Sequence, residues 1–197
     1  MQNSGRAALS RAVVVSANPD KPDLRCNVRR IRLWVGLFSI LIAAAASAES
    51  PSIALRGFDG KTRNVNEYIG HGKWVVVATW AHDCHICADE IHHMADFHQA
   101  HKDRDAMVLG VSIDGYDQVA LARAFVDRLK LPFPNLIAEP SQEVMMQFGA
   151  GEFVGTPTYY IYNPQGKIVG QNVGAITRKD VENFLASETE SDKHVNP

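Results

Sequence analysis

Two cysteines separated by two residues, Cys84 and Cys87, are the residues of this chain best suited to chemistry. On a helix the second sulfur lies one turn after the first, so the pair can close or resolve a disulfide. Thiolate is the reactive form of cysteine, and a helix start favours thiolate through its unpaired N–H groups and its positive dipole end. The spacing therefore predicts a redox-active dithiol with Cys84 at the start of a helix.

The residues beside the first sulfur carry opposing charges. A cationic His85 would stabilise the Cys84 thiolate and make the disulfide more oxidising. The carboxylate of Asp83 would repel the same thiolate. Because the two effects roughly offset each other, charge alone predicts neither a strong oxidant nor a strong reductant.

The elements around the cysteines can position them. The apolar run 74–79 predicts a buried strand, and 84–102 is compatible with a long helix that follows a sharp turn. Further strands are expected at 52–55, 62–65, 106–112, 135–138, 158–162 and 167–171, and further helices at 117–129, 141–148 and 178–186. This alternation predicts an α/β fold, a central mixed β-sheet with helices on both faces and an N-terminal β extension.

Composition narrows the class of protein. The chain has 197 residues and a formal net charge of −2, which gives no indication of nucleic-acid binding. Three cysteines are too few for a disulfide scaffold, and the third, Cys26, lies upstream of the expected domain.

The N-terminal region predicts export. A basic cluster at 29–32 precedes the apolar run 33–46, and Ala46-Ser47-Ala48 has the small-x-small pattern of a signal-peptide cleavage site. We therefore expect residues 1–48 to be a signal peptide with an unusually long n-region, cleaved after Ala48, and a periplasmic product. If uncleaved, the same run would be a membrane anchor. Residues 49–187 would form the domain, and 188–197 a polar, frayed tail.

The chain resembles the thioredoxin superfamily, and within it the exported TlpA/ResA-like thiol–disulfide oxidoreductases. The resemblance rests on the strand–WxxxCxxC–helix block 74–102 and on Gly155-Thr156-Pro157-Thr158 before a strand, a turn and a strand. It covers roughly residues 50 to 186.

The resemblance implies a role for each matching residue. Cys84 would be the exposed attacking sulfur and Cys87 the buried resolving one. Pro157 would be the cis-proline that lies against the CxxC, and Thr156 would shape the substrate groove. Trp80 would pack under the site. The substrate-binding residues would be Trp80, His85, Thr156 and Pro157. Glu90 would be the buried acid behind the sulfurs and the proton acceptor for Cys87.

Three positions depart from the family pattern. Asp83 stands where the family often has tryptophan, and Ile86 where it usually has proline. Ala78 occupies the position of thioredoxin's buried aspartate, so that proton acceptor is missing. These departures concern the redox potential and the proton route, and not the dithiol chemistry.

We interpret the chain as a thiol–disulfide oxidoreductase that needs no cofactor. The resemblance favours a reductase of protein disulfides, supplied by a membrane thiol reductase and acting in cytochrome c maturation or respiratory-protein assembly. The alternative is a periplasmic copper or zinc metallochaperone using the CxxC and nearby histidines, since six of the eight histidines fall between His82 and His101. A peroxidase-like relative is a weaker third alternative, because no PxxxT/SxxC pattern precedes Cys84.

Overall fold

The strand expected at 74–79 is the centre of the sheet, and it is buried on both faces. It is β3 (Trp74–Trp80), and all seven of its residues are buried in the computed structural model, which describes residues 50–149 and 151–195. β3 pairs in parallel with β4 (Ala106–Ser112) and antiparallel with β6 (Thr158–Tyr162). A strand covered on both faces has no polar side, which is why its sequence is a continuous apolar run.

Seven strands form one mixed sheet in the order β2-β1-β5-β4-β3-β6-β7. The remaining strands are β1 (Ala54–Gly57), β2 (Thr62–Asn64), β5 (Asn135–Ile137) and β7 (Ile168–Val173). β4 and β5 are parallel, whereas β1, β2 and β7 are added antiparallel at the two sides. The predicted mixed sheet with an N-terminal β extension is therefore confirmed.

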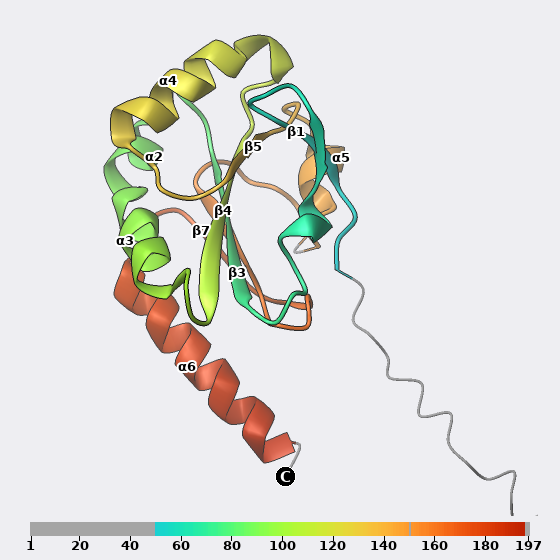
Figure 1. Cartoon of the computed structure of the whole chain (residues 1–197), viewed down its shortest axis with the longest axis vertical. Helices are drawn as coiled ribbons and strands as arrows, with labels where there is room; N and C mark the ends of the chain where they lie inside the picture. The colour runs from blue at the N-terminus through green and yellow to red at the C-terminus, as the bar shows by residue number, and fades with distance from the viewer. Residues whose placement is uncertain (1–49, 150, 196–197) are drawn as a thin grey trace, which may run out of the picture. The chain divides into compact units, whose positions relative to one another are not determined.

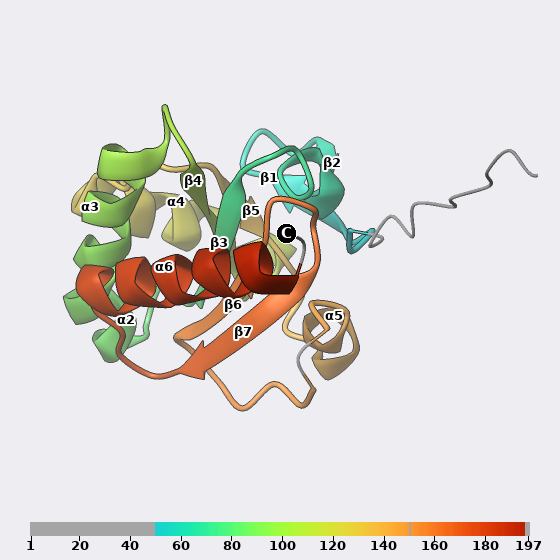
Figure 2. The same ribbon diagram turned by 90° about the horizontal axis from the view of Figure 1, so that it is seen from below.

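The helices lie on both faces of the sheet (Figure 1). They are α2 (His85–Glu90), α3 (His92–His101), α4 (Val119–Leu129), α5 (Gln142–Met146) and α6 (Arg178–Val195), with short 3-10 turns η1 (Val65–Glu67) and η2 (Tyr116–Gln118). One core cluster joins α2, α3, α4 and α6 to the face of β3 that carries Trp80, and the other joins η1 and α5 to the opposite face. Figure 2 shows α6 lying across the strands of the first face.

Two helices differ most from the expected boundaries, whereas α4 and α5 differ only by one or two residues at an end. The helix expected at 84–102 is divided into α2 and α3 at Ile91, although Ile91 keeps right-handed helical backbone angles and its N–H bonds to the Cys87 carbonyl at 3.0 Å. α6 continues to Val195, so residues 188–195 are helical where a frayed tail was expected. These residues are strongly polar, and polarity alone does not distinguish an exposed helix from a tail.

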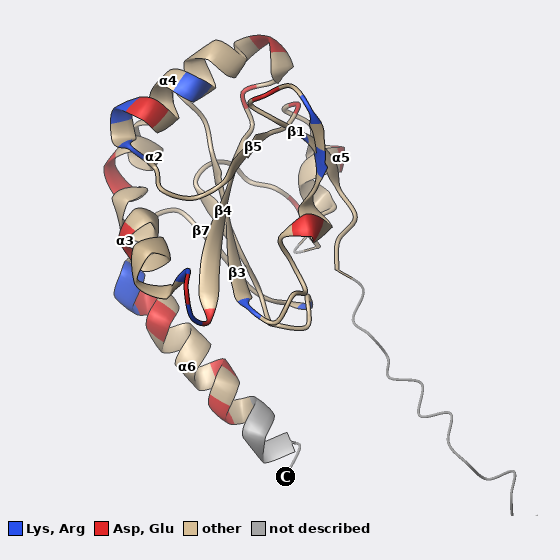
Figure 3. Ribbon diagram, in the orientation of Figure 1, with Lys and Arg blue, Asp and Glu red and all other residues tan. Residues whose placement is uncertain are grey.

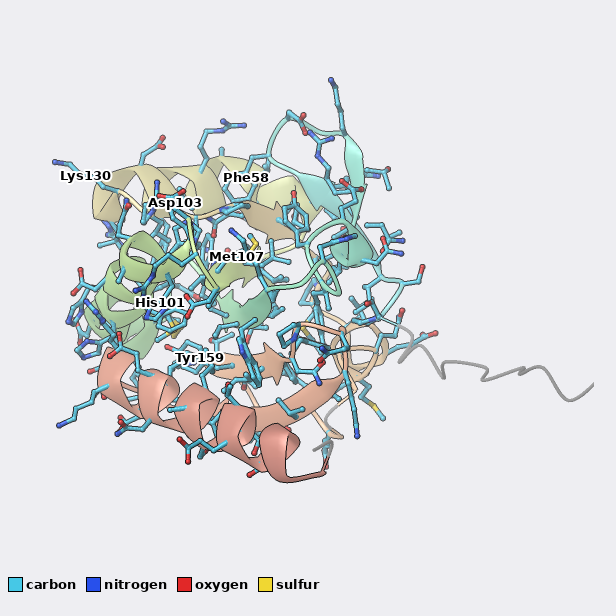
Figure 4. The ribbon with its side chains drawn as sticks, turned by 60° about the horizontal axis from the view of Figure 1, so that its bottom comes forward. Phe58, His101, Asp103, Met107, Lys130 and Tyr159 are labelled. Atoms are coloured by element: carbon cyan, nitrogen blue, oxygen red, sulfur yellow. A yellow bond between two sulfur atoms is a disulfide. The ribbon has the colours of Figure 1, made fainter. Side chains whose placement is uncertain are left out.

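The histidine-rich helix α3 has a buried side as well as a hydrated one. His98 is 5% exposed, and its Nδ1 accepts a hydrogen bond from the Val108 N–H at 3.1 Å. His101 connects α3 to α6, since its Nε2 lies 3.1 Å from Glu182 (Figure 4). Hydrogen bonds from Arg178, and then from His101, lower the pKa of the Glu182 carboxyl.

In the two described ranges, none of the helices is both long enough and apolar enough to span a membrane. The segment expected to direct export, residues 1–48, lies outside these ranges.

The stacked pair of Trp80 and Phe125 is expected to contribute strongly to stability. The ring centroids are 4.6 Å apart, and Phe125 is 2% exposed. Phe125→Ala should lower the free energy of unfolding by about 3–5 kcal/mol, because it leaves a cavity against the sheet. Leu121→Ala on the same helix should cost under about 1 kcal/mol, because Leu121 is 47% exposed. Urea unfolding measures both values, and equal losses would contradict the packing described.

His98 is expected to make stability depend on pH. Burial lowers the pKa of His98, Lys102 and Lys73 lower it further, and Asp103 opposes them. The unfolded state therefore takes up a proton before the folded state does, and the free energy of unfolding should fall as the pH drops below about 6.5. The slope between pH 7 and pH 5 should be smaller in His98→Asn and unchanged in His92→Asn, which removes an exposed histidine of the same helix. An unchanged slope in His98→Asn would contradict this assignment.

Candidate functional site

The CxxC lies where β3 ends and α2 begins. Residues 81–84 form a turn closed by the Cys84 N–H, which donates to the Ala81 carbonyl at 3.2 Å. Cys84 is the N-cap of α2, and its Sγ accepts from the Cys87 N–H at 3.1 Å. The first sulfur therefore stands at the helix start, as the spacing predicts.

Cys84 and Cys87 are joined in a disulfide. Cys84 is partly exposed, whereas Cys87 is 1% exposed and belongs to the core cluster under the helices. A substrate can therefore reach only the first sulfur from outside. This asymmetry is what a dithiol with one attacking and one resolving cysteine requires.

The loop around Pro157 lies against the disulfide. The Thr156–Pro157 peptide bond is cis, and the Thr156 carbonyl oxygen lies 3.7 Å from the Cys84 Sγ. Two buried hydrogen bonds hold the loop to β3: the Thr79 hydroxyl donates to the Thr158 carbonyl at 2.9 Å and accepts from the Thr158 N–H at 3.0 Å. The structure thus brings residues 84, 156 and 157 together, although 72 residues separate Cys84 from Thr156.

Trp80 is in the core, so its assignment as a substrate-binding residue is wrong. It is 0% exposed, stacks on Phe125, and donates from Nε1 to the Asn135 Oδ1 at 3.2 Å. A side chain without accessible surface cannot touch a protein substrate. Its position agrees with the packing role that the resemblance implies.

Glu90 and His85 are both accessible to solvent. The Glu90 side chain is 30% exposed, and its Oε2 lies 3.7 Å from the His93 Nε2. It is therefore not the buried acid that we expected behind the sulfurs. Among the described residues it makes no hydrogen bond to either cysteine. His85 is exposed at the first position of α2, where it can meet a substrate.

A buried carboxylate, Asp114, holds the turn before Cys84. Its side chain is 3% exposed, and its oxygens accept from the His82 N–H at 3.0 and 3.2 Å and from the Ser112 hydroxyl at 2.5 Å. The Nδ1 of His82 lies 2.7 Å from Oδ1. Because carboxylate oxygens accept hydrogen bonds, this contact places the ring proton on Nδ1 and leaves Nε2 as the remaining polar atom of the ring.

The contact between His82 and Asp114 was not predicted from the sequence, although the positions of the two residues along the chain indicate it. Asp114 follows β4 as the CxxC turn follows β3, and parallel strands end at the same edge of a sheet. Residues just after two neighbouring parallel strands are therefore candidates for contact.

His82, Asp83 and Asp114 form the one group in 50–149 and 151–195 whose ligand atoms lie close enough to hold a metal ion, within 4.8 Å of one another. Neither cysteine belongs to it. The Asp114 oxygens are already engaged by hydrogen bonds from His82 and Ser112. The other histidines of this region, His92, His93, His98 and His101, lie along α3 and make contacts of their own.

A mixed sheet with a disulfide at the start of the helix after its central strand, beside a cis-proline, defines the thioredoxin-like thiol–disulfide oxidoreductases. A family model described as "AhpC/TSA family" matches residues 46–171, more than half of the chain. The chain belongs to this family, and the predicted thioredoxin-like fold is confirmed.

Proteins similar to this chain carry consistent names. The thiol-disulfide oxidoreductase ResA of Bacillus thuringiensis (strain Al Hakam) is 24% identical over 157 residues, covering 80% of this chain and 86% of that protein. The ResA of Geobacillus thermodenitrificans (strain NG80-2) is 23% identical over 155 residues, with coverages of 79% and 84%. The crystal structure of a DsbF homologue from Corynebacterium diphtheriae has a TM-score of 0.61 at 21% identity, covering 71% of this chain and 86% of that one.

Removing the Asp114 carboxylate should loosen the turn that carries Cys84. Asp114→Ala leaves the His82 N–H and the Ser112 hydroxyl without their partner, which should cost about 2–3 kcal/mol in the free energy of unfolding. Asp117→Ala, three residues later and exposed, should change it by less than about 0.5 kcal/mol. Denaturant unfolding of the oxidised proteins measures both, and a neutral Asp114→Ala would show that the carboxylate does not support the turn.

Proposed function

We propose that this chain is an exported disulfide reductase of proteins. The observation that carries the proposal is the asymmetry of the CxxC, with Cys84 accessible at the helix start and Cys87 buried behind it. The Cys84 thiolate attacks a client disulfide, forms a mixed disulfide and releases one client thiolate. Cys87 then attacks Cys84, so the client leaves as a dithiol and the Cys84–Cys87 disulfide closes. Two electrons and two protons pass from the enzyme to the client.

The surface around the disulfide supports a polypeptide client. Ile86 lies between the two cysteines and is 54% exposed, and Val154, two residues before Thr156, is 75% exposed. Exposed apolar side chains beside a reactive group favour contact with another protein. The resemblance to ResA proteins supports reduction rather than oxidation and a membrane thiol reductase as the electron source, with cytochrome c maturation or respiratory-protein assembly as the setting. The signal-like segment at 1–48 supports a periplasmic site of action.

Proton transfer in this cycle stays a prediction. Glu90 lies on α2 one turn after Cys87, from where it could accept the Cys87 proton through solvent, since its side chain is partly exposed. His85 and Thr156 are proposed to line the client site.

The proposal is tested by the reduction potential of the Cys84–Cys87 couple. The full chain carrying Cys26→Ser, so that only two cysteines titrate, is equilibrated with glutathione or dithiothreitol buffers. A potential near or below roughly −270 mV would support a reductase, whereas one near about −120 mV would make the protein a disulfide-forming oxidant. The lack of any reversible two-electron couple would contradict dithiol chemistry.

Replacing Cys84 and replacing Cys87 should have different effects on the reaction with a client disulfide. In the same background, Cys87→Ser should accumulate a mixed disulfide with a client peptide, because the resolving thiol is gone. Cys84→Ser should form none and should lose reduction altogether. Mass spectrometry of the non-reduced products distinguishes the two. Equal trapping by both variants would contradict the assigned roles.

A further inference from the structure

A small cavity lies beside the active-site turn, on the side of α4. Its volume is about 180 Å³, and it is lined by His82, Leu121, Ala124, Phe125 and Arg128. His82 precedes Cys84 by two residues, and the other four residues come from α4. None of the lining residues belongs to α2 or to the loop around Pro157, so the cavity is separate from the surface around Cys84 and the cis-proline.

The wall on α4 combines apolar side chains with Arg128, for which the described residues supply no acidic partner. The Arg128 guanidinium lies 5.5 Å from the centre of the Phe125 ring. One turn before Arg128 the helix carries Ala124 and Phe125, so no carboxylate stands at helical pairing distance there. Within the described part of the chain Arg128 makes no ion pair, whereas Arg63 and Arg178 each pair with an acid four residues away.

The remaining lining residue, His82, supplies a second nitrogen to the cavity. The Nδ1 of His82 is engaged by Asp114, so Nε2 is the ring atom left for a ligand. Two carboxylates stand near this ring, but neither lines the cavity: Asp114 is held by the turn, and Asp83 is an exposed side chain. The lining therefore contains the polar groups of an imidazole and a guanidinium and no acidic group. Charged residues of both signs occur along α4 (Figure 3).

We propose that this cavity binds an acidic side chain of the client polypeptide and so selects clients with Asp or Glu close to the disulfide. A carboxylate would accept two hydrogen bonds from Arg128, in the bidentate geometry that a guanidinium favours, and a third contact from His82 Nε2 when that atom carries a proton. The methylene groups of the acidic residue would pack on Leu121, the exposed apolar side chain of the lining. This inference rests on the proposed function, because it concerns the client of that reaction.

The position of the cavity limits where the acidic residue can lie. His82 and Cys84 are two residues apart, so at most about 7 Å of chain separates the cavity from the attacking cysteine. The Cα atoms of two cysteines joined by a disulfide lie about 5.5–6 Å apart. A client residue that reaches the cavity while its cysteine is bound to Cys84 should therefore lie within about four residues of that cysteine.

The test compares peptide disulfides that differ in one residue. Each pair carries Glu or Gln at the same position two or three residues from the cysteine, and kcat/KM for reduction is measured with the full chain. The Glu peptide should be reduced about fivefold faster, and the preference should shrink in high salt. Arg128→Gln should bring the ratio to about one, and Arg128→Glu should favour a peptide with Lys at that position.

Arg123→Gln is the matched control. Arg123 is exposed on the same helix, but it is held by the Phe58 carbonyl and does not line the cavity. Figure 4 shows Phe58 beside α4. This variant should keep the preference for Glu. A purely structural effect of Arg128 on α4 would change the rates with both peptides equally and leave their ratio intact.

Three results separate the inference from its alternatives. Equal reduction of both peptides by the unaltered chain would overturn the acidic subsite while leaving the reductase intact. Loss of the preference in Arg123→Gln as well as Arg128→Gln would also overturn it, because general charge rather than the cavity would then be responsible. Failure to reduce any peptide would instead overturn the proposed function on which the inference rests.

Discussion

The burial of β3 on both faces is the constraint on which the rest of this structure depends. Even-numbered residues such as Trp74 and Trp80 enter one core cluster, and Val75 and Val77 enter the other. A shift of this strand by one residue would send Trp74 and Trp80 into the core that Val75 and Val77 fill, where the packing does not fit side chains of that size. The position of the turn after Trp80, and hence of Cys84, is therefore determined by packing rather than by the turn residues themselves.

Two neighbouring strands bring supporting groups to the same end of β3. β4 runs parallel to it, so Asp114 arrives beside the turn and binds His82, while β6 runs antiparallel, so its first residue Thr158 pairs with Thr79. The disulfide is thus supported on one side by a buried carboxylate and on the other by two buried hydrogen bonds to the cis-proline loop. This preorganisation fixes which sulfur faces solvent.

Local patterns in the sequence predicted the parts of the protein that depend on local rules. The strands at 106–112 and 158–162 agree with β4 and β6 to the residue, because a buried strand is a short apolar run bounded by turns. Features that need three-dimensional neighbours were missed. The burial of His98 depends on β4 covering one face of α3, and the contact of His82 with Asp114 joins residues 32 positions apart. The extent of α6 could not be predicted because its last turns carry no apolar stripe.

The length of α6 has a practical consequence for handling this protein. Between Arg178 and Ser191, Leu185 is the last buried residue of the helix, and the ten positions from 186 to 195 extend for about 15 Å at the usual helical rise. Figure 1 shows this end of α6 pointing away from the end of the sheet where the CxxC lies. The helix is therefore a natural spacer: a fluorophore or a tether for surface immobilisation attached at the exposed Ser191 stands clear of both the core and the disulfide.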